Sequence, residues 1–338
     1  MKAIVYSEYG PPDVLRLKEV DKPEPKEDEL LIKVRATSVG YGDLLTRNLK
    51  NATSREFNMP MFMLPMVRLV FGYWTPRKTI LGSEVSGVVE STGKDVADFV
   101  AGDEVLAYPE MNFGGYAEYI RMSSKGMVVK KPVNMSFAQA AATPMGAITA
   151  LGILRKVDMA GQRAEGADIL VNGASGSIGG FATQIAKAFG AKVTGVCGSS
   201  RQDHVRALGA DEVIDYTNED FTQRGVKYNV ILDVLGKSSF SKCRDSLKPN
   251  GIYLLASFRT KHLIQMLWTK IRGGKKVVCA PVTGSLEDLH TIRGMVEQGK
   301  LKVIIDKAFP LEQAVEAHRY AESDERRGTV VIAIGQQE

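Results

Sequence analysis

The stretch Gly173-Ala174-Ser175-Gly176-Ser177-Ile178-Gly179 decides the fold of this chain. It follows the apolar run 168–173 (DILVNG) and opens a run that is predicted to be helical over 178–189. Ala174 stands where the motif G-x-G-x-x-G has its first glycine, whereas Gly176 and Gly179 keep the remaining register. A strand, a glycine-rich turn and a helix in this order are typical of a dinucleotide site.

The physical basis of such a site is simple. Glycines permit a tight turn, and the unpaired amides at the start of the helix face the pyrophosphate. We therefore predict that a nicotinamide dinucleotide is bound here by Ser175, Gly176, Ser177, Ile178 and Gly179. A strand-to-helix turn without a ligand is the alternative.

The end of the next strand indicates which dinucleotide is bound. NAD enzymes usually place Asp or Glu there, about 20 residues after the glycines, to bind the ribose hydroxyls. No acidic residue lies between Gly179 and Asp203, and the strand 192–197 runs into Gly198, Ser199, Ser200 and Arg201. Because a guanidinium pairs with a 2′-phosphate, we predict NADPH, held by Gly198, Ser199 and Arg201. The alternative makes Arg201 a solvated surface residue.

From residue 167 onward, strands and helices alternate. The predicted strands are 168–173, 192–197, 212–216, 229–234, 251–257 and 276–281, with helices over 178–189, 201–208 and near 238–247. This alternation predicts parallel pairing and a doubly wound sheet. Before residue 124 the chain instead shows short strands separated by glycine turns, at 2–6, 30–36, 84–91, 104–108 and 116–121. That rhythm predicts a compact β-rich module.

Together these features resemble the medium-chain dehydrogenase/reductase superfamily, and within it the zinc-independent quinone oxidoreductases of the zeta-crystallin-like branch. The resemblance covers essentially the whole chain and is most specific over 81–96, 102–107, 172–197 and 208–216. It implies an α/β fold with a GroES-like catalytic domain over 1–123 and 285–338. A Rossmann domain over 124–284 would be inserted between these two parts, with the active site in the cleft.

The resemblance also bears on metal binding. Zinc-dependent relatives carry Cys, His and Cys at positions that are occupied here by Gly40, Ser83 and Met145, none of which is a competent zinc ligand. We therefore expect no metal. Without a Lewis acid, hydride exchange with simple alcohols is disfavoured, whereas an electron-poor substrate needs no such help. The implied activity is NADPH-dependent reduction of quinones or α,β-unsaturated carbonyls.

The remaining site residues follow from matched positions. Tyr41 is a candidate proton donor, although relatives carry their tyrosine at the position of Leu45. Asp43 is expected to fix the local backbone more than to act as a base, and Thr46 is a second candidate donor. Candidate cofactor walls lie at Tyr216, Leu235, Ala256 and Ser257. Arg326, Arg327 and Gly328 are interpreted as an exposed turn, with an approach to the cofactor as the alternative.

Two other functions remain open. An enoyl-thioester reductase would need a larger cleft and a well-placed tyrosine, and a non-catalytic NADPH-binding protein would bind the cofactor without turnover. The family also implies a homodimer that pairs through the outer strand Lys276–Ala280, since its Val277-Val278 run would otherwise leave an apolar edge.

Composition places broad bounds on partners and compartment. The 338 residues suggest about two domains, and the net charge of +5 is interpreted as a mixed-charge surface and not as a nucleic-acid site. Three scattered cysteines and an N-terminus without signal-peptide character favour the cytoplasm. The apolar segment 57–74 is broken by prolines and Arg68, which argues against a spanning helix. We expect it to pack beside the active site, or else to dock peripherally on a membrane or partner.

Overall fold

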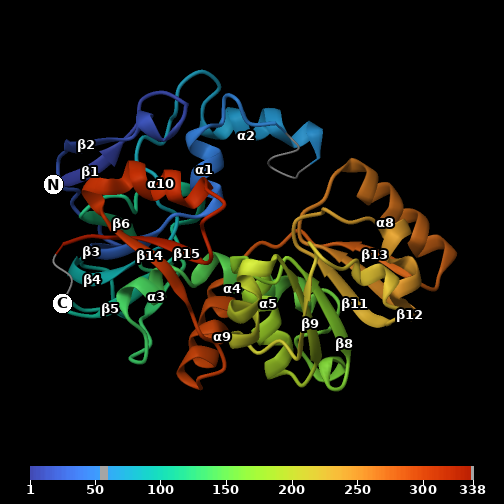
Figure 1. Cartoon of the computed structure of the whole chain (residues 1–338). Coiled ribbons are helices and arrows are strands. Elements are labelled where there is room, and N and C mark those ends of the chain that lie inside the picture. Colours follow the sequence, from blue (N-terminus) through green and yellow to red (C-terminus); the bar gives the residue numbers. More distant parts are fainter. Residues whose placement is uncertain (54–59, 336–338) are drawn as a thin grey trace.

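The computed structural model describes residues 1–53 and 60–335. Within these ranges the chain forms two large sheets, each accompanied by helices, that lie side by side in Figure 1. The β-rich N-terminal module lies on the left of that view and the strands between 168 and 279 lie on the right. The last two strands return to the left-hand sheet.

Six parallel strands form the right-hand sheet, in the order β10-β9-β8-β11-β12-β13. The chain runs outward from β8 in one direction and then outward from β11 in the other, so the switch point of the sheet lies between β8 and β11. The strands are β8 (Asp168–Asn172), β9 (Lys192–Cys197), β10 (Glu212–Asp215), β11 (Tyr228–Asp233), β12 (Leu247–Leu255) and β13 (Lys276–Cys279). The predicted doubly wound sheet is confirmed.

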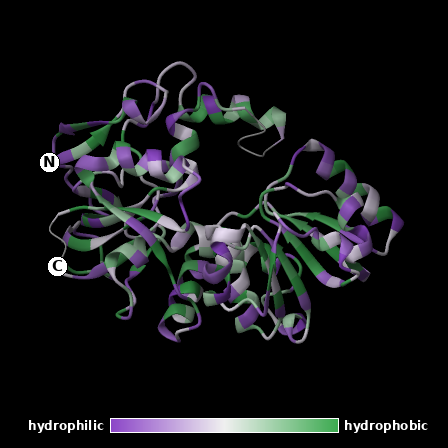
Figure 2. Cartoon of the chain, viewed as in Figure 1, coloured by the Kyte–Doolittle hydropathy of each residue, from purple (hydrophilic) through white to green (hydrophobic). Residues whose placement is uncertain are grey.

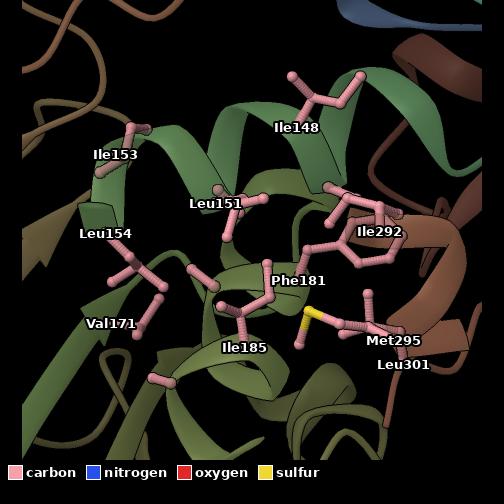
Figure 3. Close-up of a cluster of buried hydrophobic side chains, with 14 of the residues drawn as sticks. Ile148, Leu151, Ile153, Leu154, Val171, Phe181, Ile185, Ile292, Met295 and Leu301 are labelled. Carbon is pink, nitrogen blue, oxygen red and sulfur yellow. The ribbon is translucent and has the colours of Figure 1, made fainter. Parts of the chain in front are cut away.

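Helices cover both faces of this sheet because its buried residues alternate between two cores. Ile169 and Val171 of β8 face α4 (Pro144–Arg155), α5 (Ser177–Ala188) and α9 (Leu286–Glu297), as Figure 3 shows in part. Leu170 faces the opposite core, which includes Phe240 and Tyr253. The other helices of this half are α6 (Gln202–Ala207), α7 (Phe240–Cys243) and α8 (Thr260–Arg272).

The left-hand sheet has seven strands, in the order β14-β15-β3-β4-β5-β7, with β6 paired to β3. Its bounds are β3 (Glu29–Ser38), β4 (Val85–Thr92), β5 (Glu104–Ala107), β6 (Tyr119–Ser123), β7 (Val128–Lys130), β14 (Ile305–Pro310) and β15 (Thr329–Ala333). A separate hairpin joins β1 (Lys2–Val5) and β2 (Arg16–Glu19), and the helices are α1 (Tyr41–Arg47), α2 (Leu64–Phe71), α3 (Phe137–Ala141) and α10 (Ala314–Glu322). This is the expected GroES-like β domain.

The C-terminal segment divides between the two halves. Strand β15 pairs antiparallel with β3, whereas Ile292 and Met295 of α9 belong to the core of α4 and α5. The predicted boundary at 284/285 therefore has a helix of the Rossmann side just beyond it. Helix α8 was missed altogether, because no strand or helix was predicted between 257 and 276.

Position 179 tests how strictly the loop demands glycine. A Cβ at Gly179 would lie 2.8 Å from the carbonyl carbon of Gly173 and overlap its oxygen. We expect Gly179→Ala to lower the free energy of unfolding by about 2–3 kcal/mol, because backbone cannot yield as a side chain can. Denaturant unfolding of the cofactor-free protein measures this.

Gly176→Ala is the matched control. Its φ of −81° suits any residue, and its Cβ would stand 3.6 Å from the oxygen of Gly173, an ordinary contact. We expect this variant to unfold like the parent. Equal stability of the two variants would contradict the packing argument.

Candidate functional site

The phosphate loop joins the carboxyl end of β8 to helix α5. Gly176 takes the N-cap position with an extended backbone, and no side chain among the described residues caps the helix. Ser175 and Ile178 are half-buried and Ser177 is exposed, so the first turn is accessible. The uncapped start of α5 fits a pyrophosphate, because its free amides and the helix dipole both favour an anion.

The carboxyl end of β9 lies beside this loop. Gly198 caps the short 3-10 helix Ser199–Arg201, and the ring of Tyr216 lies over it, since a Cβ at Gly198 would be 3.4 Å from the phenol oxygen. Tyr216 is 62% exposed. Arg201 reaches across to the other half of the molecule and donates through Nη2 to the carbonyl oxygen of Arg326 at 2.7 Å.

That contact corrects the interpretation of Arg326 as part of an exposed turn. Arg326 is half-buried and donates to the carbonyl oxygen of Ala321 at 3.2 Å. Burial, followed by the positive charge of Arg201, lowers its pKa. Two guanidinium groups therefore face one region at the edge of the cleft, and an anion there would relieve their repulsion. They are 125 residues apart in sequence, which is why local reasoning missed the pair.

A carboxylate also lies at this edge, on the neighbouring strand. Asp215 ends β10 and accepts hydrogen bonds from the hydroxyls of Ser199 at 2.5 Å and Thr217 at 2.7 Å. Asn218 donates to it at 2.9 Å. These donors, Ser199 first, lower the pKa of Asp215. Asp215 thus lies beside the end of β9, but its oxygens already accept hydrogen bonds from neighbouring side chains. Ser199 is one of these donors.

The ends of β11 and β12 are tied together by a buried carboxylate. Asp233 accepts from the phenol of Tyr253 at 2.7 Å, from the amide of Ser238 at 2.8 Å and from the side chain of Asn172 at 3.2 Å. Beyond these strand ends Leu235 is 52% exposed, and Ala256 and Ser257 are half-buried. All three lie at the sheet edge that also carries the phosphate loop.

The three candidate catalytic residues all lie on helix α1 but differ in burial. Tyr41, at its first turn, is 54% exposed, whereas Asp43 and Thr46 are 0% and 4% exposed. Asp43 accepts from the amide of Gly40 at 3.0 Å and from that of Gly82 at 2.9 Å. Asp43 therefore fixes two backbone segments, and of the three residues Tyr41 alone is exposed to solvent.

A second buried carboxyl links the two halves. Glu84 accepts from the hydroxyl of Ser38 at 2.5 Å and from the amide of Met145 at 2.7 Å. Met145 lies in the first turn of α4, so the glutamate acts on the positive end of that helix. Burial raises the pKa of Asp43 and of Glu84 to about 7. The carboxyls hold the segments that carry Gly40, Gly82 and Met145.

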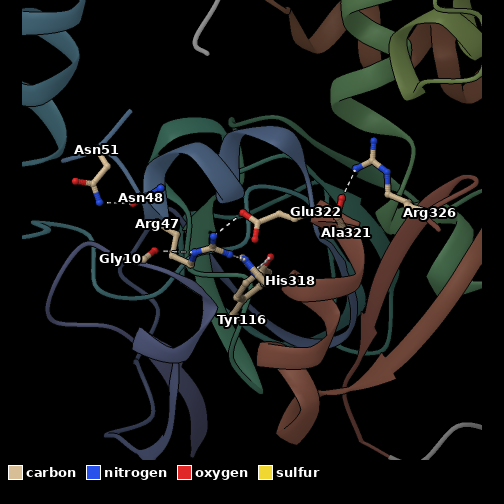
Figure 4. A network of polar contacts seen from close by, with 9 residues as sticks. All are labelled: Gly10, Arg47, Asn48, Asn51, Tyr116, His318, Ala321, Glu322 and Arg326. Carbon is tan, nitrogen blue, oxygen red and sulfur yellow. Dashed lines mark hydrogen bonds and ion pairs between the residues drawn. The ribbon is translucent and has the colours of Figure 1, made fainter. Parts of the chain in front are cut away.

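A polar network holds α1 in place (Figure 4). Arg47, 1% exposed, donates to the oxygen of Gly10 at 3.1 Å and pairs with Glu322 at 2.5 Å. Its Nη1 lies 2.7 Å from Nδ1 of His318, and since arginine only donates, that nitrogen accepts. Nε2–H then donates to the phenol of Tyr116 at 3.0 Å. Helix α10 thereby positions the helix that carries Tyr41.

Tyr41 and Arg326 line one pocket of about 330 Å³, together with residues of α1 and the end of α10. The lining residues lie within 41–52 and 321–326, in the catalytic half. The candidate catalytic tyrosine therefore borders the same pocket as Arg326, whose carbonyl oxygen accepts from Arg201 of the other half.

The three positions at which zinc-dependent relatives carry zinc ligands, Gly40, Ser83 and Met145, lie close to the buried carboxyls of Asp43 and Glu84. Gly40 and Met145 donate to them, and Ser83 separates Gly82 from Glu84. Over residues 1–53 and 60–335, no three His, Cys, Asp or Glu side chains gather in a way that could hold a metal ion.

The chain matches two family descriptions. Residues 26–133 match the alcohol dehydrogenase GroES-like domain, and residues 208–332 match the family described as zinc-binding dehydrogenase. The chain belongs to the medium-chain dehydrogenase/reductase superfamily, in its quinone oxidoreductase-like branch. That superfamily consists of nicotinamide-dependent oxidoreductases, as the phosphate loop predicts.

Individual relatives span nearly the whole chain. It is 32% identical to the chloroplastic NADPH-dependent alkenal/one oxidoreductase of Arabidopsis thaliana, over 98% of this chain and 79% of that protein. It is 30% identical to the chloroplastic quinone-oxidoreductase homolog of Spinacia oleracea, over 98% of both. The quinone oxidoreductase from Coxiella burnetii has the same fold, with a TM-score of 0.81, 28% identity and 99% of both chains covered.

The apolar segment 57–74 is more exposed than the expected loop and helix packed beside the active site. Residues 57–59 lie outside the described residues, and the rest forms the 3-10 helix Met61–Met63 and α2, with many side chains exposed. None of the helices in the described ranges has the length and apolar character needed to cross a membrane. The cytoplasmic location stays a prediction.

The buried glutamate predicts a pH dependence of stability. A raised folded-state pKa means that the stabilising contribution of Glu84 is complete below its ordinary value of 4.5 and is lost as the pH rises to about 7. Glu84→Gln removes this titration. The variant's deficit in unfolding free energy should therefore shrink across this window, by at most about 3 kcal/mol. Thermal unfolding of parent and variant at several pH values measures it.

Glu8→Gln, at an exposed position, is the control and should show a constant difference from the parent. A Glu84→Gln deficit that does not change between pH 4.5 and 7 would contradict the raised pKa.

Proposed function

We propose that this chain is an NADPH-dependent, zinc-independent reductase of quinones or α,β-unsaturated carbonyls. The bound reduced nicotinamide supplies a hydride to the electron-poor carbon of the substrate. The chain would supply the phosphate site, the pocket beside α1 and a hydroxyl that lines this pocket. The observation that carries the proposal is the bonding of the buried carboxyls Asp43 and Glu84.

The oxygens of these carboxyls accept hydrogen bonds from other groups of the protein. Asp43 accepts backbone amides from two loops, and Glu84 accepts a helix amide and a hydroxyl. Their neighbours Gly40, Ser83 and Met145 offer no ligand set for zinc. A substrate bound here therefore has to be electrophilic by itself, which favours quinones and conjugated carbonyls over simple alcohols. The names of the Arabidopsis and Coxiella relatives, an alkenal/one oxidoreductase and a quinone oxidoreductase, agree with this class.

We assign the proton to Tyr41, because this residue is 54% exposed and lines the pocket while Thr46 is buried. A donor there stabilises the negative charge that develops on the substrate oxygen. Asp43 is a positioning residue, since it holds the N-cap of the helix that carries Tyr41. The pyrophosphate is assigned to Ser175, Gly176, Ser177, Ile178 and Gly179, and the walls of the cofactor site to Gly198, Tyr216, Leu235, Ala256 and Ser257.

We propose NADPH over NADH because the guanidinium groups of Arg201 and Arg326 lie near each other beyond the end of β9, where the adenosine would bind. Arg201 and Arg326 lie close enough for one to lower the pKa of the other, and a 2′-phosphate would neutralise both. Ser199 serves indirectly, by occupying the carboxylate of Asp215.

Pairing of two chains through β13 also belongs to this proposal. The strand is the last of its sheet, and Val277 is 2% exposed while Val278 is half-buried. Its outer edge has the hydrogen-bonding capacity for a second β13. The catalytic domain over 1–123 and 285–338 and the Rossmann domain over 124–284 are likewise kept as a proposed division.

The experiment that tests the function is anaerobic oxidation of NADPH and NADH against quinones, enones, enoyl thioesters and simple aldehydes, with and without a chelator. We expect turnover of quinones or enones that the chelator does not affect. The same panel run on Tyr41→Phe tests the donor, for which we expect a loss of about 10²-fold with enones.

Three results would overturn this assignment. Chelator-sensitive alcohol oxidation would refute zinc independence, and turnover confined to enoyl thioesters would favour that rival. Tight NADPH binding without turnover of any electrophile would favour a non-catalytic role.

Cofactor choice rests on Arg201. We expect Arg201→Ala to raise the KM for NADPH by about 10- to 100-fold, because an ionic hydrogen bond to a phosphate is worth about 1.5–3 kcal/mol. The KM for NADH should change little. Arg206→Ala, on the exposed side of α6 and paired with Asp203, is the control. An unchanged NADPH KM in Arg201→Ala would remove the assignment.

A further inference from the structure

An exposed apolar surface lies on the segment 61–74. Met61, Phe62, Leu69 and Trp74 are 73%, 64%, 67% and 75% exposed. Soluble proteins usually bury side chains of this size, and a contiguous group of them marks an interaction surface. Figure 2 shows α2 as one of the more hydrophobic helices on the outside of the molecule.

The opposite side of α2 is fixed to the catalytic domain. Phe71 is 7% exposed and packs on Phe113, with ring centroids 5.7 Å apart. The phenol of Tyr9 donates to the carbonyl oxygens of Phe71 and Gly72 at 2.9 and 2.8 Å. Leu69 therefore lies on a helix whose other side is fixed to the catalytic domain, and Met61, Phe62 and Trp74 flank that helix.

Helix α8 presents a second apolar stripe. Ile264, Leu267, Trp268 and Ile271 follow each other at helical spacing and are 64%, 60%, 48% and 86% exposed. Its other side is fixed, because Thr269 is 2% exposed and accepts from the amide of Val277 at 3.0 Å. In Figure 1 both helices lie on the outside of the molecule, in the upper part of the view.

The charged side chains of the two segments that carry the stripes have one sign. Residues 60–83 and 246–286 contain no Asp or Glu. They contain ten Lys and Arg: Arg68, Arg77, Lys78, Lys248, Arg259, Lys261, Lys270, Arg272, Lys275 and Lys276. Of the 44 basic and 39 acidic residues in the chain, 34 and 39 remain elsewhere, so the rest of the molecule is net acidic. The positive net charge belongs to these two segments.

We propose that these two surfaces dock the protein peripherally on an anionic lipid bilayer. Apolar side chains would enter the boundary between headgroups and acyl chains, with Tyr73, Trp74 and Trp268 at the depth that aromatic rings prefer. Lys270 and Arg272, at the end of α8, would meet the anionic headgroups. The proposal goes beyond the reductase activity and does not depend on it.

The charges of α8 favour a bilayer over a second copy packed face to face on this helix, a contact distinct from the proposed pairing of β13 edges. A symmetric dimer through α8 would bring the same patch of both copies together. Lys261, Lys270 and Arg272 would then face their own counterparts, with no acidic residue of 246–286 to pair with them. An anionic surface instead neutralises them. With 8 residues in α2 and 13 in α8, each helix is too short to span a bilayer.

Vesicle flotation tests the proposal with the full chain and no nicotinamide. We expect binding to phosphatidylcholine vesicles that contain about one-third phosphatidylglycerol, and little binding to phosphatidylcholine alone. Raising the ionic strength to about 1 M, where the Debye length falls to about 3 Å, should weaken the binding. Trp74→Ser and Ile271→Ser should each reduce it roughly tenfold, because each removes one large side chain from the bilayer.

Val133→Ser is the matched control, since it removes an apolar side chain that is 97% exposed elsewhere. It should bind vesicles like the parent, and thermal unfolding should show all three variants folded. Absence of parent binding to the anionic vesicles, or equal binding by Trp74→Ser and Ile271→Ser, would overturn the proposal. A smaller solution mass of these variants without loss of vesicle binding would assign the surface to a second copy.

Discussion

Helix α5 lies against strand β8 only because position 179 has no side chain. The close approach of Gly179 to the backbone of Gly173 fixes the angle at which the helix leaves the loop. Helix α4 follows the same rule, since a Cβ at Gly146 would overlap the hydroxyl of Ser177. The start of α5 is thus placed by a close contact with backbone at Gly179, and the first turn of α4 by a close contact with the Ser177 side chain at Gly146.

The buried carboxyls extend this arrangement to the other half of the molecule. Glu84 joins strand β4 of the catalytic sheet to the first turn of α4, and Asp43 joins two loops beside it. Burying them costs free energy, which shows in their raised pKa values, and the surrounding donors offset part of that cost. The region that would hold zinc in other relatives is therefore a structural junction in this chain.

Much of this was accessible from the sequence. Parallel strands such as 168–173 and 229–234 are apolar runs between turns, so their positions and the doubly wound order were predictable. The burial of Thr46 and Asp43 was not, because nothing local indicates a helix over 41–47 turned inward. The contact between Arg201 and Arg326 joins residues 125 positions apart. Helix α8 was not among the predicted elements, although Ile264, Leu267, Trp268 and Ile271 recur at helical spacing.

The charge of the chain shows how an average can mislead. A net charge of +5 spread over 338 residues indicates a mixed-charge surface and no nucleic-acid site. The structure shows why the acid-free segments 60–83 and 246–286 matter: each carries a helix whose outer side is apolar and whose inner side is held. Basic residues on a solvated helix need no explanation, and neither do scattered apolar ones. Both together on two fixed helices define a surface that water and like charge disfavour and that an anionic, partly apolar phase stabilises.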